Sequence, residues 1–278
     1  MSRPVLVRGR YACAYESGPR PVDTIVGADG PLSPMAGLLA RAVRPLTAYC
    51  SAVTSERVVA LTYDDGPDPD HTPGVLDALR AGQTRATFFV LVERAQAHPD
   101  LVQRIVAEGH EVGLHGRDHR RISAAGLAAS MREIRAARQE LARLAGQPVR
   151  WYRPAYGAIR IDQQLAVRAL GLDVPVWSAW ARDWEDEEVS VLAERAAAAL
   201  HPGGVMLLHD ASAGLAPDDS GLTHQPTFDR GELTRRLLIA AEGMGYRLTT
   251  LGGLAKGYPQ GRVPWFESRA KARAGTGA

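Results

Sequence analysis

The sequence predicts an α/β fold in which parallel strands are covered by helices. From residue 57 onward, short apolar or β-branched runs alternate with stretches of helical periodicity, and polar residues end each run. The stretches between the runs are long enough for crossover helices, which join parallel strands. Periodicity does not decide between a closed barrel and an open, doubly wound sheet. A chain of 278 residues, 45% of them apolar, can bury the core that either fold needs.

About seven strands are expected, one for each apolar run. In chain order the runs are 58–63, 86–91, 111–114, 149–152, 174–177, 205–208 and 246–249. Residue types mark the helix ends between them: Thr72 and Pro73 suit a helix start as cap and first-turn residue, and Gly109 and Gly146 suit helix ends.

Two flanking segments lie outside this alternation. Residues 1–55 are rich in Pro and Gly up to Met35 and then weakly helical through Leu46, which predicts an N-terminal extension. Residues 56–258 are predicted as the main domain. Residues 259–278 are predicted as a C-terminal tail, disordered from Phe266 onward.

Charge and cysteine content exclude some classes of protein. The net charge is +2, and 33 basic residues are interspersed with 31 acidic ones, so we expect no nucleic-acid partner. Two cysteines are too few for a disulfide framework. Cys13 and Cys50 are therefore expected to be unpaired thiols.

The sequence also predicts no membrane partner. Its most apolar early stretch, residues 35–53, is interrupted by arginines and a proline, and it falls short of the roughly 20 residues of a membrane span. Residues 1–30 contain no apolar run of signal-peptide length. We expect a cytoplasmic protein, and nothing in the pattern indicates its oligomeric state.

Reactive side chains follow the predicted strands, at the ends where parallel α/β folds place their sites. In chain order they are Asp64 and Asp65, His115, Arg153, Asp183 and Trp184, and His209 with Asp210.

Two aspartates at one strand end suit metal chemistry. Adjacent side chains point in different directions, so Asp64 and Asp65 can offer one carboxylate to a metal and the other to a water molecule. Taken alone, Asp-Asp-Gly-Pro is more often a turn. The spacing of His115 and His119 puts two imidazoles on one side of a helical turn, as metal pairs require. As an isolated pair, they are more often surface or supporting histidines.

Three further features carry a functional and a structural interpretation. His209 suits a general acid, because histidine titrates near neutrality, but a core histidine bonded to a carbonyl fits the pattern too. Arg153 suits a carboxylate clamp or a surface position. Of Trp177, Trp180 and Trp184, some are expected in the core, and any exposed one suits stacking on a sugar.

Five of these segments, in order, resemble the motifs of the NodB-like polysaccharide deacetylases. They are 62–67 (TYDDGP), 115–119 (HGRDH), 153–157 (RPAYG), 182–184 (RDW) and 207–209 (LLH). The match spans roughly residues 57–254, which makes 56–258 the catalytic domain. The resemblance implies a distorted, incomplete (β/α) barrel rather than an open sheet.

The resemblance also implies a divalent metal and an acid–base pair. Asp65, His115 and His119 would be the metal ligands, with zinc favoured over cobalt, nickel, iron or manganese. Asp64 would be the general base and His209 the general acid. The reaction would be hydrolysis of an N-acyl, most commonly N-acetyl, group on an amino sugar.

The same comparison implies supporting roles for five further residues. Arg153 would position the base, and Asp183 would orient polar partners near Arg153 and the acid. The backbone N–H of Tyr156 would help to bind the oxyanion. Trp184 and Leu207 would line the acyl pocket.

Departures from the family pattern bear on the substrate. Gly116 replaces a Ser or Thr, Ala155 replaces a proline, and Ser178 and Trp180 stand where acidic residues are common. With the missing signal peptide, these changes favour a small amino-sugar compound over a wall polymer. Two alternatives stay open. One is a hydrolase of a non-sugar amide, such as a formamide or cyclic ureide. The other is a catalytically silent carbohydrate-binding barrel, but the intact Asp64 and His209 argue against it.

Overall fold

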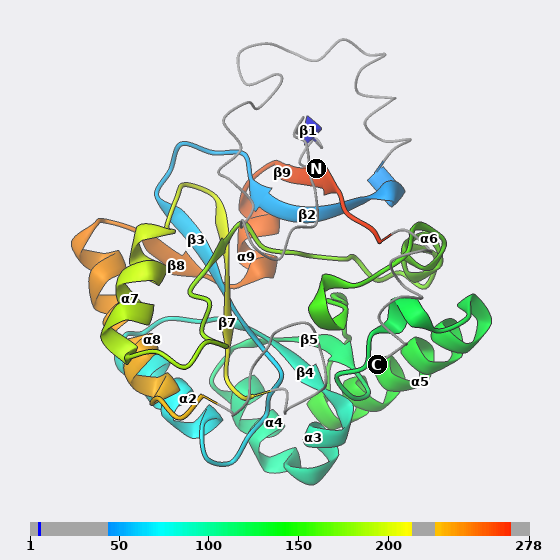
Figure 1. The fold of residues 1–278 in the computed structure, drawn as a ribbon, viewed down its shortest axis with the longest axis horizontal. Coiled ribbons are helices and arrows are strands. Elements are labelled where there is room, and N and C mark those ends of the chain that lie inside the picture. Colours follow the sequence, from blue (N-terminus) through cyan, green and yellow to red (C-terminus); the bar gives the residue numbers. More distant parts are fainter. Residues whose placement is uncertain (1–4, 7–43, 213–225, 268–278) are drawn as a thin grey trace.

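One curled sheet with β3 at its centre organises the molecule, which is described by a computed structural model (Figure 1). The structure describes residues 5–6, 44–212 and 226–267. The strands are β1 (Val5–Leu6), β2 (Thr47–Ala52), β3 (Val58–Asp64), β4 (Thr87–Leu91), β5 (Glu111–Gly116), β6 (Ala179–Trp180), β7 (Gly204–His209), β8 (Arg247–Thr249) and β9 (Gln260–Pro264).

The strand order is β1-β9-β2-β7-β3-β4-β5, with β6 paired to β7 and β8 paired to β3. The pairs from β3 to β8 are all parallel, as crossover helices require. Every residue of β3 is buried, which explains its unbroken apolar and β-branched sequence. The predicted mostly parallel α/β architecture is therefore confirmed.

Single bridges continue the curl between β5 and β2. Leu114 pairs with Tyr152, Trp151 with Asp173, and Tyr49 with Pro175. Two of the predicted strands, 149–152 and 174–177, are thus reduced to isolated bridges, and a short strand, β6, lies after them instead. This irregular side makes the barrel a distorted one, as the family resemblance implied.

The flanking segments contribute strands that the sequence pattern did not predict. Residues 44–46 form a 3-10 helix, η1 (Arg44–Leu46), where the weakly helical pattern was expected to end, and strand β2 follows directly. β2 pairs antiparallel with both β7 and β9, so β9 is a sheet strand and not part of a tail. Residues 7–43 and 268–278, with the predicted helical start, Cys13 and most of the predicted disordered tail, lie outside the described residues.

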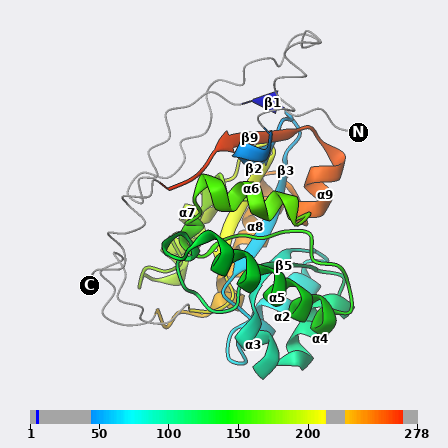
Figure 2. The same cartoon turned by 90° about the vertical axis from the view of Figure 1, so that its right-hand side faces the viewer.

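Helices pack on both faces of the curled sheet (Figures 1 and 2). They are α2 (Thr72–Ala81), α3 (Val92–Ala97), α4 (Pro99–Ala107), α5 (Leu127–Ala145), α6 (Ile161–Ala169), α7 (Val189–Ala198), α8 (Arg230–Gly243) and α9 (Leu251–Gly257), with the short turns η2 (Ile122–Ala124) and η3 (Ala155–Gly157). Helices α2 to α8 pack on the outer face of the sheet, and α9 packs on its opposite face. α8 packs between α2 and α7, whereas α5 packs on α3 and α4.

The predicted helix ends are close to those observed. Gly109 and Gly146 follow α4 and α5 with φ of 81° and 63°, a conformation that glycine adopts without a steric penalty. Thr72 was predicted as the N-cap of α2 but is its first helical residue, and His71 is the N-cap. The helix therefore starts one residue earlier than predicted. Among the described residues, no helix has the length and apolar character needed to cross a membrane.

Candidate metal centre and active site

The predicted site residues meet at the carboxyl ends of the parallel strands. Asp64 is the last residue of β3 and His209 the last of β7, and these two are paired in the register of the two strands. His115 lies near the end of β5. Arg153 follows the bridge between Tyr152 and β5. The fold thus brings together side chains that are up to 145 positions apart in the chain, as Asp64 and His209 are (209 − 64).

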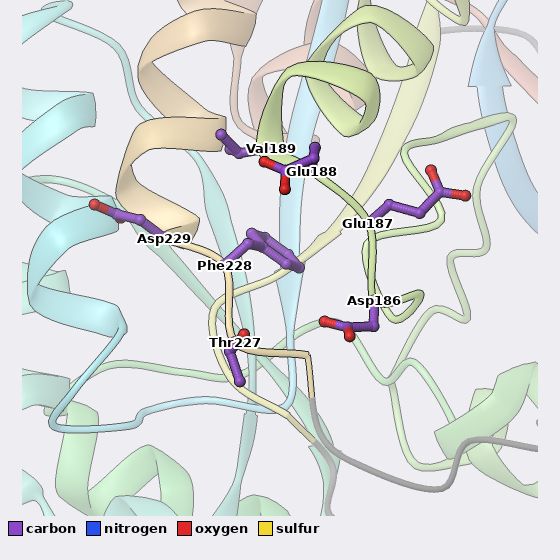
Figure 3. Close-up of a pocket in the computed structure, with 7 residues that line it drawn as sticks. All are labelled: Asp186, Glu187, Glu188, Val189, Thr227, Phe228 and Asp229. Atoms are coloured by element: carbon purple, nitrogen blue, oxygen red, sulfur yellow. The ribbon is translucent and has the colours of Figure 1, made fainter.

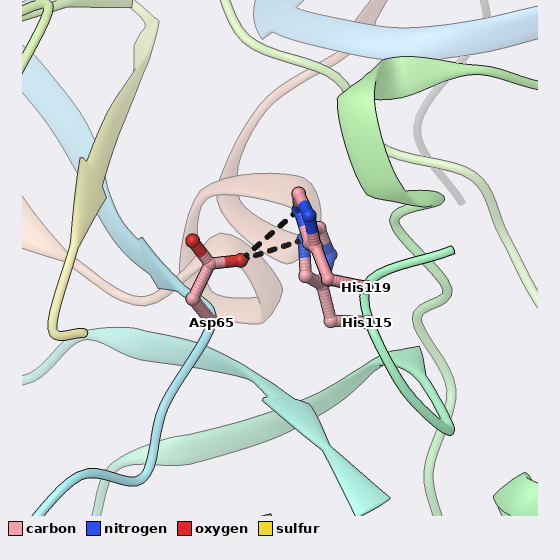
Figure 4. A group of neighbouring side chains, drawn as sticks. All are labelled: Asp65, His115 and His119. Carbon is pink, nitrogen blue, oxygen red and sulfur yellow. Dashed lines mark ion pairs between the residues drawn. The ribbon is translucent and has the colours of Figure 1, made fainter. Parts of the chain in front are cut away.

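Asp65, His115 and His119 form a candidate metal centre (Figure 4). Asp65 Oδ1 lies 3.2 Å from His115 Nε2 and 3.3 Å from His119 Nε2. One potential ligand atom from each residue lies within 4.8 Å of the others. Asp65 Oδ1 is buried and has no hydrogen-bond partner among the described residues. Because a buried carboxylate oxygen without a hydrogen bond needs another partner, the donor set fits a divalent cation held between the three side chains.

Hydrogen bonding and charge prepare the three ligands. His115 Nδ1 donates to the carbonyl oxygen of Arg153 at 2.8 Å, so its Nε2 presents a lone pair toward Asp65. Burial lowers the pKa of His119, which favours the neutral, metal-binding imidazole. Burial acts against ionisation of Asp65, but the adjacent His119 and His115 outweigh it and hold the pKa of Asp65 well below its usual range.

His115 differs from His119 in its charge preference. Burial alone would lower the pKa of His115, but the neighbouring carboxylates of Asp64 and Asp65 raise it overall. A cation bound here would therefore compete with a proton for His115 Nε2.

Arg153 holds Asp64. Its Nη1 donates to Asp64 Oδ1 and to Thr62 Oγ1, both at 2.8 Å. The guanidinium is fully buried and lies over the ring of Phe89, with 4.1 Å from Cζ to the ring centroid. Because one Asp64 oxygen is fixed in this way, the orientation of the whole carboxylate is fixed. Arg153 was predicted as a carboxylate clamp, and the carboxylate that it binds is that of Asp64.

Asp183 holds His209 at two points. Its Oδ1 lies 2.8 Å from His209 Nδ1, and its Oδ2 accepts from the backbone N–H of His209 at 2.7 Å. Burial opposes the charge on His209, but the Asp183 carboxylate outweighs it and raises the pKa of His209 to about 9. The imidazole is therefore charged at neutral pH with Nε2 available to donate a proton.

Tyr156 adopts a left-handed backbone conformation beside the metal centre. Its φ is 58°, and its ring centroid lies 4.4 Å from that of His119. Trp184 packs edge-on against His209 at 5.8 Å between ring centroids. Leu207, in β7, is buried. The positions of these three residues beside the site agree with their expected roles, and those roles remain predictions.

Sequence reasoning missed two supporting residues. Arg230, the first residue of α8, is buried, donates to the carbonyl oxygen of His209 at 3.1 Å and lies 3.5 Å from Asp183 Oδ2. Asp210 was noted without a role; it accepts from the N–H of Gly66 at 3.1 Å and from the hydroxyl of Thr72 at 2.6 Å. The Asp229-Arg230 pair at the start of the last long helical stretch was the one sequence signal for Arg230.

A pocket of about 460 Å³ opens between the segment after Trp184 and the segment before Arg230 (Figure 3). It is lined by Asp186, Glu187, Glu188, Val189, Thr227, Phe228 and Asp229. Four of these side chains are carboxylic acids; Glu187 pairs with Arg195, and Asp229 accepts the backbone N–H of Glu232. The lining disfavours an anionic ligand.

Comparisons with known proteins agree with this site. The family model described as polysaccharide deacetylase matches residues 51–175. The chain is 36% identical over 173 residues to a chitooligosaccharide deacetylase of Rhizobium leguminosarum bv. trifolii, which covers 62% of this chain and 79% of that protein. It is 34% identical over 195 residues to a chitooligosaccharide deacetylase of Sinorhizobium fredii, covering 69% of this chain and 89% of that protein.

A solved structure agrees as well. The peptidoglycan deacetylase PdaC of Bacillus subtilis superposes with a TM-score of 0.61 at 27% identity, covering 72% of this chain and 91% of that one. Matching motifs, matching fold and identities above 30% over most of two relatives lead to one conclusion. The chain belongs to the NodB-like polysaccharide deacetylase family, the hydrolases that cleave the amide bonds of acetylated sugars.

Proposed function

We propose that this protein is a metal-dependent hydrolase that removes an N-acetyl group from an amino sugar within an oligosaccharide or a small amino-sugar compound. The observation that carries the proposal is Asp65 Oδ1, which is buried, has no hydrogen bond among the described residues and lies within 3.3 Å of two imidazole Nε2 atoms. A carboxylate and an imidazole suited to base and acid roles, Asp64 and His209, end two adjacent strands beside it.

One carboxylate and two imidazoles are the donor set that zinc prefers in hydrolytic sites, and cobalt, nickel, iron and manganese accept it too. A bound divalent cation supplies Lewis-acid polarisation of the substrate carbonyl and lowers the pKa of water from about 16 toward 7. Asp65, His115 and His119 would hold the cation and leave positions open for substrate.

Asp64 suits the task of accepting a proton from the attacking water. Arg153 fixes one of its oxygens, so the carboxylate does not rotate away during the reaction. The Tyr156 N–H would donate to the oxygen that becomes negative as water adds to the carbonyl carbon. Removing one such preorganised donor costs about 10² to 10³ in turnover in other hydrolases.

His209 suits the second half of the reaction. When the C–N bond breaks, the departing nitrogen needs a proton, because an amide anion is a very poor leaving group. Asp183 keeps His209 protonated near neutral pH and points its Nε2 away from the pair. The proton thus passes from His209 Nε2 to the nitrogen of the sugar.

Several observations favour a sugar as substrate. The two relatives above are named for their action on chitooligosaccharides. Trp180 packs against both Trp177 and Trp184, at 6.4 and 5.5 Å between ring centroids. All three tryptophans are only partly buried, and the exposed part of an indole can stack on a sugar. If a part of the substrate occupies the pocket between residues 186–189 and 227–229, the four carboxylic acids of the pocket would favour a neutral group over a phosphate there.

Mass spectrometry of an amide panel tests the proposal. Protein loaded with Zn²⁺ or Co²⁺ is incubated with N-acetylated monosaccharides, chitooligosaccharides, nucleotide sugars and non-sugar formamides. Loss of one acetyl group is expected from the neutral oligosaccharides, and not with Asp64→Asn protein under the same conditions. Turnover restricted to non-sugar amides would replace the sugar assignment. No turnover on any member would leave carbohydrate binding without catalysis as the function.

A further inference from the structure

The segment that follows β9 lies against the loop that carries Tyr156. We call residues 265–267 the C-terminal strap and residues 154–159 the oxyanion loop. The indole N–H of Trp265 donates to the carbonyl oxygen of Gly157 at 2.8 Å. The backbone N–H of Glu267 donates to the carbonyl oxygen of Ile159 at 2.8 Å. The strap therefore holds this loop at two points.

The carboxylate of Glu267 makes a third connection, through Arg121. It is mostly buried, and its two oxygens accept from Arg121 Nη1 and Ser123 Oγ, each at 2.6 Å. The Arg121 guanidinium lies 4.7 Å from the centroid of the Tyr156 ring. The same ring contacts His119, with 4.4 Å between the ring centroids. Contacts thus run without a gap from Glu267 through Arg121 and Tyr156 to a candidate metal ligand.

The oxyanion loop needs such support because its backbone is strained. Tyr156 has a φ of 58°, a value that a residue with a Cβ rarely adopts, whereas Gly157, with a φ of 64°, adopts its conformation without a steric penalty. A strained conformation persists only where the surroundings hold it. Inside the loop, the N–H groups of Gly157 and Ala158 bond back to Pro154 and Ala155. These short-range bonds keep the turn closed, and the strap adds two hydrogen bonds to the loop from a segment 108 residues further along the chain.

We propose that Trp265 and Glu267 are positioning residues, which aim the backbone N–H of Tyr156 at the reacting carbonyl by fixing the oxyanion loop. The proposal rests on the function proposed above. The strap lies beyond residues 51–175, the part of the chain that the family model matches.

Kinetics separate this role from general structural support. An oxyanion donor acts on the transition state, so its misplacement lowers kcat and leaves KM nearly unchanged. A displacement of about 1 Å costs on the order of 10²-fold in rate. We expect Glu267→Ala to lower kcat on the best amide of the panel by about 10- to 100-fold, with KM changed less than about two-fold.

Two other variants grade the effect. Trp265→Phe keeps an aromatic ring and loses only the N–H bond to Gly157, so its kcat should fall by less than that of Glu267→Ala. Glu267→Gln keeps an oxygen acceptor for Arg121 or Ser123 and should recover part of the rate. Phe266→Ala is the matched control: Phe266 lies between the two positioning residues but is 41% exposed. Its kcat should equal that of the unchanged protein.

Hydrogen–deuterium exchange of the peptide covering residues 153–159 gives a readout independent of activity. The amides of this peptide should exchange faster in Glu267→Ala and Trp265→Phe than in Phe266→Ala, while thermal unfolding confirms that all variants are folded. Unchanged exchange in both variants overturns the proposal, and so does faster exchange with unchanged kcat. If the unchanged protein hydrolyses nothing while exchange still increases in the variants, the proposed function fails and the bracing of the loop stands.

Discussion

At the scale of single residues, the backbone assigns different partners to two adjacent aspartates. Asp64 ends a regular strand and meets Arg153, whereas Asp65 has a φ of 79° and turns toward two histidines. Asp210 holds the turn by accepting the N–H of Gly66, where there is no room for a side chain. The difference in partners between the two carboxylates therefore follows from their backbone conformations.

Substitutions of the two aspartates should separate metal binding from turnover. Loss of a residue that only orients a metal ligand lowers metal affinity by roughly 10- to 100-fold. Asp65→Ala removes a predicted ligand itself, so Zn²⁺ affinity should fall by more than this. Asp64→Asn should keep Zn²⁺ affinity within a few-fold and lose about 10² to 10⁴ in kcat, the range of acid–base catalysis. Titration calorimetry and steady-state kinetics measure the two effects. Equal losses of metal in both variants would contradict the division of roles.

The Asp183–His209 pair predicts a change in the pH profile. The Asp183 carboxylate raises the pKa of His209 to about 9, so the acid is protonated at neutral pH and kcat should fall as pH rises through that pKa. In Asp183→Asn the negative charge is lost, the pKa of His209 falls, and the alkaline limb of kcat should move to lower pH. If the alkaline limb of the kcat profile of Asp183→Asn stays at the same pH, then a group other than His209 titrates in that range.

At the scale of elements, sequence pattern found the strands whose residues are buried on both faces. β3, β4 and β7 are unbroken apolar or β-branched runs and were predicted within two residues. β2 (TAYCSA) and β9 (QGRVP) contain small or polar residues, a glycine or a proline, and their pairing joins segments about 210 residues apart in the chain. Local pattern carries no information about such distant partners.

The same reason limits how much of the site was predicted. The residues predicted as ligands, base and acid lie at or soon after strand ends, where parallel folds place reactive groups, and the structure brings them together, while their roles remain predictions. Arg230 and Glu267 act through long-range contacts from helix α8 and from beyond β9, where no motif marks them.

The metal-ligand loop supplies a prediction at the element scale. Gly116 ends β5 with a φ of 138°, and a Cβ there would lie 2.9 Å from the carbonyl oxygen of Asp118. Gly116→Ser would restore the hydroxyl common in the family, but we expect it to destabilise the fold by about 1–3 kcal/mol through backbone strain. Zn²⁺ affinity should fall as well, because the loop joins His115 to His119.

Gly243→Ala is the matched control for Gly116→Ser. Gly243 is helical, and nothing lies within 4 Å of a Cβ built on it. An alanine there should stabilise the protein by about 0.4–1 kcal/mol, because it restricts the unfolded chain. Urea denaturation compares the two variants. A Gly116→Ser protein as stable as the unchanged chain would show that the loop relaxes to accept a side chain.

At the scale of the whole molecule, the two ends of the described chain complete the sheet. β2 lies between β7 and β9, and Arg262 of β9 reaches Asp173 with two hydrogen bonds of 2.9 and 3.1 Å. Arg262 also donates to the backbone and side-chain oxygens of Thr47 in β2. We propose on this basis that the catalytic unit includes both strands and the strap, and extends beyond residues 56–258.

Breaking this connection tests whether the flanking strands belong to the cooperative fold. Arg262 is almost fully buried, so Arg262→Met leaves oxygens of Thr47 and Asp173 without this donor, although Arg168 still binds Asp173 at 2.6 Å. The free energy of unfolding should fall by about 1–3 kcal/mol, the cost of leaving buried hydrogen-bonding groups without partners, because Arg168 still balances the Asp173 charge.

The exposed pair between Arg80 and Asp77 is the control for Arg262→Met. The Arg80 side chain is 63% exposed, so Arg80→Ala should cost less than about 1 kcal/mol. Urea denaturation followed by circular dichroism and by tryptophan fluorescence measures both variants, and a single transition in both signals is expected if β2 and β9 unfold with β3. If Arg262→Met lowers the free energy of unfolding no more than Arg80→Ala does, then the flanking strands are separable from the barrel. The catalytic unit would then be residues 56–258, as predicted from the sequence.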